Sequence, residues 1–397
     1  MTPLVLTAFT AVNALGYGVS AITQALRKGM TGLRRCTFEQ APLDTYTGMV
    51  MGLEAQPVAA ALAHFDCRNN RLAQATLLQD QFVQHVTQAR QRYGALRIAV
   101  IVGTSTSGIL ETEHAYRKRD PSSGMLPPDY QLQYTHNLYA TADFVQQFLQ
   151  LQGPALVIST ACSSSAKVFA AAQRMMALDL CDAAVVGGVD SLCLNTLYGF
   201  SSLELIAREP CRPCSADRAG ISIGEGGGFA LLERPGSNSA HSGVNLLGYG
   251  ESADAYHMSS PRPDGAGAAL AMTQALAMAE LTPADIDYIN MHGTASQVND
   301  TMEDKAITTV FGIDTACSST KGWTGHTLGA AGITEAVISA ICIQEGFLPG
   351  SLNTQAIDPS FNSRILLHNN TRPVARVMSN SFGFGGSNCS LIFGRAL

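Results

Sequence analysis

The chain has 397 residues, of which 46% are hydrophobic and 14% are charged, and its net charge is −6. This composition provides enough apolar material for two domains with a large interior, and the acidic balance argues against a nucleic-acid surface. The sequence contains no uninterrupted apolar run of the roughly 18 residues that a membrane span needs. We therefore expect a globular protein with neither a nucleic-acid partner nor a membrane span.

The first residues of the chain and the spacing of its cysteines indicate the cellular compartment in which we expect the protein. The first ten residues, which include Thr and Pro but no basic region, are typical of a β-strand rather than a leader segment. The ten cysteines lack the spacing of a disulfide framework, so we expect a reduced, cytoplasmic protein. The CxxC pair formed by Cys211 and Cys214 lies in a charged loop. We interpret it as an ordinary turn rather than a zinc or redox site, and we expect no metal.

Short apolar runs alternate with helical segments along the chain. The runs are rich in Val, Ile and Leu at successive positions, which is typical of strands covered on both faces. Helices are predicted over residues 166–180 and 265–280, so the fold class is α/β with buried sheets. After a first strand within 1–10, the predicted strands cover residues 97–102, 154–158, 183–186, 229–232 and 288–291.

A polar connection over residues 235–243 divides the predicted elements into two halves. We predict an amino-terminal domain at 1–243 and a carboxy-terminal domain at 244–397. The pentapeptide Thr-Ala-Cys-Ser-Ser occurs once in each half, at 160–164 and at 315–319. The repetition hints at an internal duplication, although five residues can coincide by chance.

Cys162 lies on a strand-to-helix turn, between the strand at 154–158 and the helix at 166–180. At a helix amino terminus the dipole and the unpaired N–H groups favour a thiolate, so we expect a lowered pKa for this thiol. The same N–H groups can hold an oxyanion. Cys317 lacks this turn, because the next helix is expected only near 325–332, and we interpret it as a buried small hydrophobe.

Two histidines in the carboxy-terminal half lie in glycine-rich, Thr-containing segments. His292 begins His-Gly-Thr-Ala-Ser, and His326 ends Lys-Gly-Trp-Thr-Gly-His. Each neighbours a predicted strand end, where α/β proteins place their ligands. A single histidine there would usually be structural, but two of them together with Cys162 indicate nucleophilic thiol chemistry.

Taken together and in this order, a series of motifs resembles the β-ketoacyl-acyl-carrier-protein synthases, which are decarboxylating condensing enzymes of the thiolase superfamily. The resemblance runs along essentially the whole chain. It implies a thiolase fold of two βαβαβαβαβ halves packed as five α-β-α-β-α layers, usually as a dimer. The motifs lie at 160–164, 187–190, 212–220, 224–226, 254–258, 292–294, 319–321, 325–326 and 380–386.

The resemblance also discriminates within the superfamily. Thiolases pair their nucleophile with a second cysteine and a histidine, whereas initiating and chalcone-synthase-like enzymes use Cys, His and Asn. The set of Cys162, His292 and His326, with Lys321 beside it, resembles the elongating synthases. The family nucleophile matches Cys162, and Cys317 falls on the strand that leads to the lysine motif.

The resemblance implies a two-step acyl extension. Cys162 would take an acyl chain from an acyl carrier protein and condense it with malonyl carrier protein, giving 3-oxoacyl carrier protein and CO2. His292 and His326, as neutral imidazoles, could donate N–H groups to the enolate left by loss of CO2. We expect no bound cofactor, because the phosphopantetheine arm of the carrier protein carries the substrates.

Further residues are expected to support the reacting groups. The backbone N–H groups of Cys162 and, by resemblance, of Phe384 would form the oxyanion hole. Lys321 would orient the site electrostatically, with Glu335 as the counter-charge for a buried ammonium. Asp300 is expected in a supporting role.

Other positions are expected to contact the substrate. Thr294 and Ser296 resemble the hydroxyl residues that contact the phosphopantetheine arm. Phe382 and Phe384 lie in a Phe-Gly-Phe-Gly-Gly segment whose glycines permit a backbone hinge, and by resemblance Phe384 gates the acyl pocket. Thr106 occupies a position near the acyl pocket, where a larger apolar residue can stand.

The sequence does not decide which partner proteins the chain has. An acyl carrier protein is expected, but Glu204 stands where some members carry a basic residue for docking it. The chain could act in fatty-acid elongation as a homodimer, or in a polyketide or aryl-polyene system as the catalytic subunit of a heterodimer with a chain-length factor. A non-catalytic subunit of the same fold is the remaining alternative, against which Cys162 and the two histidines argue.

Overall fold

The computed structural model describes residues 1–236 and 243–395. Residues 237–242 of the predicted polar connection at 235–243 therefore lie outside the described residues, and the two domains at 1–243 and 244–397 stay a prediction. The predicted elements themselves are present, most with ends shifted by one to three residues.

The strands form one long hydrogen-bonded sheet to which each half contributes one side. The halves meet where β1 and β10 pair antiparallel, with Leu4 opposite Leu246 and Val5 opposite Asn245. On the amino-terminal side the order is β1 (Leu4–Asn13), β9 (Gly226–Glu233), β7 (Ala183–Asp190), β5 (Ile98–Gly103) and β6 (Ala155–Ile158), with β2 (Gly16–Tyr17) off the path. On the other side it is β10 (Val244–Ala253), β17 (Ser387–Arg395), β16 (Arg376–Gly383), β11 (Tyr288–Asn290), β12 (Ala316–Ser318) and β14 (Arg364–Ile365).

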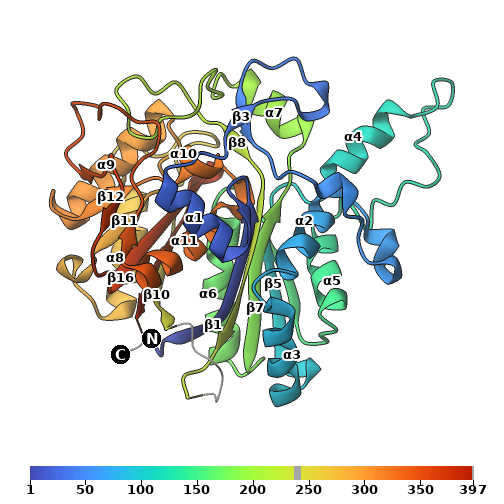
Figure 1. Cartoon of the computed structure of the whole chain (residues 1–397), viewed down its shortest axis with the longest axis horizontal. Helices are drawn as coiled ribbons and strands as arrows, with labels where there is room; N and C mark the ends of the chain where they lie inside the picture. The colour runs from blue at the N-terminus through green and yellow to red at the C-terminus, as the bar shows by residue number, and fades with distance from the viewer. Residues whose placement is uncertain (237–242, 396–397) are drawn as a thin grey trace.

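Helices cover both sides of the two sheet regions and give the five layers that were predicted (Figure 1). The outer layer of the amino-terminal half contains α2 (Arg68–Leu77), α3 (Phe82–Tyr93) and α5 (Tyr139–Phe148). The shared middle layer contains α6 (Ser164–Ala177) and α11 (Ala331–Glu345), and the opposite outer layer contains α8 (Ala266–Ala279) and α9 (Gln297–Phe311). This arrangement is the thiolase fold.

Shorter elements surround the layers. The remaining helices are α1 (Gly18–Lys28), α4 (Ile109–Arg117), α7 (Leu194–Ser202) and α10 (Lys321–Thr324). The remaining strands are β3 (Arg34–Arg35), β4 (Tyr46–Gly48) and β8 (Ile223–Gly224) in one small sheet, and β13 (Phe347–Leu348) and β15 (Asn370–Thr371) in another. The helical turn α10 corrects the expectation that no helix would begin before residue 325.

The middle helices approach each other closely because small residues face each other. A Cβ on Gly332 of α11 would lie 2.5 Å from the backbone nitrogen of Ala166 in α6, so only glycine fits there. The stretch Leu328–Glu345 has the length and hydropathy of a membrane span, but 89% of it is buried inside the protein. Its apolar character therefore reflects its position as a central core helix.

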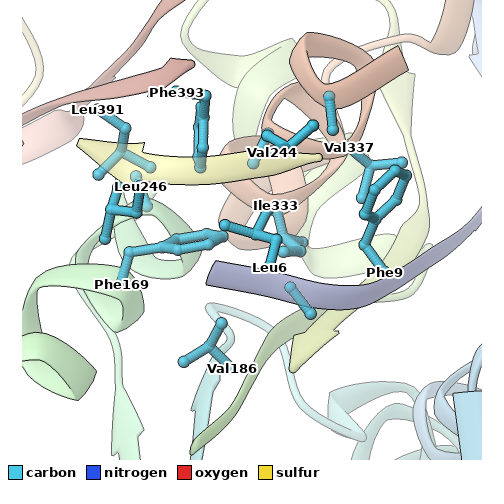
Figure 2. Packing of buried hydrophobic residues seen from close by; sticks show 14 of the residues in the cluster. Leu6, Phe9, Phe169, Val186, Val244, Leu246, Ile333, Val337, Leu391 and Phe393 are labelled. Atoms are coloured by element: carbon cyan, nitrogen blue, oxygen red, sulfur yellow. The ribbon is translucent and has the colours of Figure 1, made fainter. Parts of the chain in front are cut away.

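The hydrophobic core lies where both sheet regions meet the middle helices (Figure 2). Phe169 of α6 and Phe393 of β17 pack edge to face, with ring centroids 5.5 Å apart. Leu6 of β1 and Ile333 of α11 pack in the same cluster. Burying a side chain of this size contributes roughly 1.5–3 kcal/mol to folding, so this core holds the two halves in a fixed relation.

β7 is longer than predicted, and this extension positions the site. The prediction ends at Val186, but the strand continues through Gly187 and Gly188 to Asp190. A Cβ at either glycine would overlap a neighbour, the ring of Phe229 in one case and the side chain of Ser165 in the other. Gly187 therefore makes room for the ring of Phe229 in β9, and Gly188 lets β7 pass close to the first turn of α6.

Candidate active site

Cys162 lies immediately before the amino terminus of α6, as the sequence predicts. The turn that presents it contains Ala161 with a φ of 52°, a left-handed conformation that is uncommon outside glycine. The Ser164 hydroxyl closes the turn by accepting from the Thr160 N–H at 2.9 Å and donating to the Ala161 carbonyl at 2.6 Å. The thiol is thus fixed at the end of a buried helix, with 6% of the residue exposed.

His326 reaches the thiol from the other half of the chain. Its Nε2 lies 3.0 Å from Cys162 Sγ. Its backbone N–H donates to the Ser222 carbonyl at 2.8 Å, and its carbonyl accepts from Gly224 N–H at 2.9 Å. These bonds attach the segment that carries His326 to β8 of the amino-terminal half.

His292 follows β11 and completes the group. Its ring packs edge to face with that of His326, with centroids 5.3 Å apart and an interplanar angle of 84°. The thiol of Cys162 and one ring nitrogen of each histidine all lie within 4.8 Å of one another. Zinc also accepts such donor atoms, but the ammonium of Lys321, 3.4 Å from His292 Nδ1, opposes a cation at this place.

Lys321 and Glu335 form an ion pair that is 1% and 2% exposed. The ammonium also donates to the backbone carbonyl of His292. Burial raises the pKa of Glu335 to about 7, and the charge of Lys321 opposes that rise. Burial, and then the charge of Lys321, hold the pKa of both His292 and His326 well below the usual range, so both imidazoles are neutral.

The thiol itself differs from the sequence prediction. We expected the helix amino terminus to lower the pKa of Cys162, but burial raises it to about 11. The charge of Lys321 and a hydrogen bond from the Phe384 backbone N–H act in the opposite direction and are outweighed. The prediction was wrong because it did not include the burial of the thiol, which disfavours the charged thiolate. Cys162 therefore rests as a thiol, and His326 is the group placed to take its proton.

A cavity opens in front of the thiol and contains most of the predicted substrate residues. Thr294 and Ser296 line it, with their hydroxyl oxygens 3.0 Å apart, and so do Phe382 and Phe384. The ring of Phe384 packs against Phe200, with centroids 5.6 Å apart. The other lining residues are mostly apolar or small: Leu205, Ile221, Ser259, Ser260, Pro261, Val298, Asn299, Gly383, Gly386 and Asn388.

Besides the Lys321–Glu335 pair, two predicted residues lie outside this cavity. Thr106 is not part of its lining; its N–H and hydroxyl both donate to Asp190, each at 3.0 Å. Asp300 accepts from the backbone N–H groups of Cys214 at 2.8 Å and Ala295 at 3.2 Å. Asp300 therefore holds the loop that follows His292 and does not contact the reacting groups in the described structure.

The remaining cysteines of the predicted motifs are free and buried. Cys317 lies in β12 and is 0% exposed, and burial raises its pKa far above that of an ordinary thiol. The Cys211 thiol donates to the Lys321 carbonyl at 3.2 Å, and burial raises its pKa to about 11. These environments are those of packing residues.

Sequence reasoning missed Glu303, which holds His292 in place. Its carboxylate accepts from the backbone N–H groups of His292 at 2.9 Å and Gly293 at 2.7 Å, and from the Asn380 amide at 3.3 Å. Burial raises the pKa of Glu303 to about 7. The available signal was an acidic residue one helical turn after Asp300, on a face of α9 that must be buried.

Comparison with known proteins identifies the family of the chain. The models for the amino-terminal and carboxy-terminal domains of β-ketoacyl synthases match residues 1–237 and 244–355. The 3-oxoacyl-[acyl-carrier-protein] synthase 2 of Vibrio cholerae is 30% identical over 99% of both chains. The mitochondrial synthase of Arabidopsis thaliana is 41% identical over 61% of this chain, and the match spans 56% of that relative.

A solved structure is similar over the whole fold. It is a ketosynthase from Xenorhabdus doucetiae in complex with its chain length factor. The matched chain of this complex is 38% identical, with a TM-score of 0.89 over 100% of this chain and 98% of that one. The fold, the site geometry and these matches lead to one conclusion: the chain belongs to the β-ketoacyl synthase family, the condensing acyltransferases that include the 3-oxoacyl-[acyl-carrier-protein] synthases.

Proposed function

We propose that this chain extends an acyl group by decarboxylative condensation with malonyl carrier protein, using Cys162, His292 and His326 as its reacting residues. The observation that carries the proposal is the buried thiol 3.0 Å from His326 Nε2, with a second neutral imidazole beside it. A thiol supplies the covalent acceptor, and two neutral imidazoles supply N–H donors for an enolate.

In the first step the acyl chain moves to the enzyme. The proton of Cys162 Sγ passes to His326 Nε2, the sulfur attacks the thioester carbonyl, and the proton goes on to the leaving phosphopantetheine thiol. The backbone N–H of Phe384 already contacts the thiol, and with the N–H of Cys162 it would stabilise the oxyanion. His326 Nδ1 has no hydrogen-bond partner in the described structure, so neither neutral tautomer is fixed.

In the second step the extender loses CO2. The electrons of the broken carbon–carbon bond form an enolate, whose oxygen accepts from Nε2–H of His292 and of His326. The carbanion attacks the acyl carbonyl on Cys162, the carbon–sulfur bond breaks, and the released thiolate takes up one proton from solvent. Lys321 contributes by keeping both imidazoles neutral, because its charge lowers their pKa.

The substrates are delivered on a carrier protein, and no cofactor is needed beyond its phosphopantetheine arm. Thr294 and Ser296 present two hydroxyls in the cavity that leads to Cys162. We propose that the phosphopantetheine arm lies along these hydroxyls. We also propose that the protein works in the cytoplasm, where thiols stay reduced. Glu204 is exposed after α7 and offers no attraction to an acidic carrier, so other residues at the rim must dock it.

A partner subunit is part of the proposal. β6 ends its sheet and pairs only with β5 among the described strands, and Leu156 of β6 is 43% exposed. An unpaired edge with an exposed apolar residue favours association. The partner is either a second copy or a chain-length-factor homologue, which would make this chain the catalytic subunit. The mass of the purified complex, measured with and without the products of neighbouring genes, decides between them.

Mass spectrometry of the protein after incubation with acyl carrier protein thioesters tests the reaction. Acyl mass should appear on the peptide containing Cys162 and be absent in Cys162→Ala. Cys317→Ala is the matched control, since it removes the cysteine of the second pentapeptide, and it should acylate normally. Acyl mass on Cys317, or acylation that survives Cys162→Ala, would contradict the proposal.

A further inference from the structure

Asp190, at the end of β7, is a 0% exposed carboxylate that the mechanism above does not use. It accepts from the hydroxyl of Thr104 at 2.6 Å and from the N–H of Ser105 at 2.8 Å. It also accepts from the N–H and hydroxyl of Thr106, each at 3.0 Å, from the Ser105 hydroxyl, and from the N–H of Gly329 at 2.6 Å. A charged acceptor strengthens each of these bonds.

These donors come from both halves of the chain. Residues 104–106 follow β5 in the amino-terminal half, whereas Gly329 lies three residues after His326 in the other half. The approach is close, because a Cβ on Gly329 would lie 2.7 Å from both Asp190 Oδ2 and the Ser105 nitrogen. Asp190 therefore bridges the loop after β5 and the segment that carries His326.

The same region supports the nucleophile. A Cβ on Gly103, at the end of β5, would lie 2.5 Å from the Ser165 nitrogen in the first turn of α6. The Ser165 hydroxyl accepts from the Ile333 N–H of α11 at 2.9 Å. The ends of β5 and β7 thus abut the turn that presents Cys162, and the charge of Asp190 contributes to the raised pKa of the Cys162 thiol.

We propose that Asp190 is a positioning residue for the condensing reaction, which fixes His326 Nε2 relative to Cys162 Sγ by joining the loop at 104–106 to Gly329. The inference rests on the proposed function, because it assigns Asp190 a task in that same site. An amide in its place would offer one acceptor oxygen and would turn an NH2 donor toward N–H groups that need an acceptor. The His326 segment would then shift, and a misplacement of about 1 Å can cost up to about 100-fold in rate.

The test compares Asp190→Asn with Glu233→Gln. Glu233 is also buried, at 1% exposure, and pairs with Arg92. It lies beside the opposite end of β7, since Glu233 faces Ala183 whereas Asp190 faces Gly226. Each variant removes one buried negative charge, Asp190→Asn from β7 and Glu233→Gln from the neighbouring β9. Only Asp190 lies next to the segments that carry Cys162 and His326.

Two quantities are measured: the kcat for condensation, and the pH profile of Cys162 alkylation by iodoacetamide, read by site-resolved mass spectrometry. Asp190→Asn should lower kcat on the order of tenfold or more, with KM for the carrier protein nearly unchanged. It should also move the alkylation midpoint to lower pH, because a negative charge near the thiol is gone. Glu233→Gln should change neither quantity.

A kcat for Asp190→Asn near that of the wild type, an equal loss in both variants, or an alkylation midpoint that stays or rises would overturn the inference. If Asp190→Asn does not fold, Thr104→Val serves instead, because it removes one donor and keeps the carboxylate. It should lower kcat several-fold, and an unchanged kcat would again overturn the inference. Failure of the proposed function is recognised separately, since wild-type Cys162 would then not be acylated.

Discussion

The ammonium of Lys321 is bound between the Glu335 carboxylate and the backbone carbonyl of His292, with all three groups buried. The ion pair therefore does two things at once. It holds the peptide that carries His292, and its positive charge adds to burial in keeping the imidazoles of His292 and His326 neutral. Stability and protonation state are coupled through a single side chain.

Glu335→Gln should destabilise the protein by about 3–5 kcal/mol, because it leaves the Lys321 ammonium buried without its counter-charge. The exposed pair of Arg27 and Glu345 provides the control, with 44% of the Glu345 side chain exposed. Glu345→Gln should cost about 0–1 kcal/mol. Urea denaturation of both variants measures the difference, and equal midpoints would show that the buried pair has no special contribution.

His292→Ala should lower CO2 release from malonyl carrier protein by about 100-fold or more, because one of the two enolate donors is lost. Transfer of an acyl chain to Cys162 should fall much less, since His326 remains 3.0 Å from the thiol. His114→Ala, a partly exposed histidine paired with Glu39, is the control. Radiolabelled CO2 and the mass of the acyl-enzyme report the two steps. Equal losses in both steps would argue against separate roles.

Decarboxylation should not fall as the pH drops from 7 to 6. A histidine with an ordinary pKa near 6.5 would lose its neutral form in this range, but the pKa of His292 and of His326 is held well below it. Replacing both members of the pair, as Lys321→Met with Glu335→Gln, removes the lysine charge, raises both pKa values and should move the acid limb to higher pH. CO2 release measured across pH 5 to 8 checks this. An acid limb that moves to lower pH would be inconsistent with the assigned effect of Lys321.

Alkylation of Cys162 in the free enzyme should still be accelerating at pH 10. Only the thiolate reacts, and the pKa of about 11 means that its fraction keeps growing there. An ordinary cysteine, with a pKa near 8.5, would have levelled off by then. Iodoacetamide labelling followed by peptide mass spectrometry measures the rate. An alkylation rate that levels off between pH 6 and 8 would show that Cys162 rests as a thiolate. It would then support the expectation that the helix dipole lowers the pKa of Cys162.

Gly224→Ala should lower both stability and activity. A Cβ there would overlap the Thr324 carbonyl oxygen, a backbone atom that cannot move without displacing Gly325 and His326. Gly199 in α7 is the matched control, because a Cβ there meets nothing within 4 Å. Gly199→Ala should stabilise the helix by roughly 0.5–1 kcal/mol and leave activity unchanged. Thermal unfolding and condensation assays on both variants make the comparison, and an active, stable Gly224→Ala would refute the close contact.

Much of the site could be read from the sequence because strand ends and glycine turns leave local signals. The turn at Cys162 and the segment at His292 follow from apolar runs that stop at small residues, whereas the strand before Lys321 was implied by the resemblance. The fold class followed from the same runs, and the resemblance of ordered motifs supplied the five layers. These features depend on neighbours close in the chain.

The rest depends on contacts between distant segments. The raised pKa of Cys162 reflects how completely the second half covers the thiol, which no local pattern reveals. Thr106 turns toward Asp190 instead of the cavity because β7 extends through two glycines that resemble a strand end. Glu303 accepts from backbone N–H groups eleven and ten residues earlier, so its role appears only when α9 folds back against β11.

The reacting thiol and its imidazole partner are separated by 164 positions in the chain and come from opposite halves. On the proposed mechanism, the acyl group is therefore stored on one half while the groups that stabilise the attacking carbanion belong to the other. Neither half alone could complete either step. Carbon–carbon bond formation in this protein thus takes place where the two halves of the chain meet. Any change that weakens the contacts between the halves should therefore reduce condensation before it unfolds the protein.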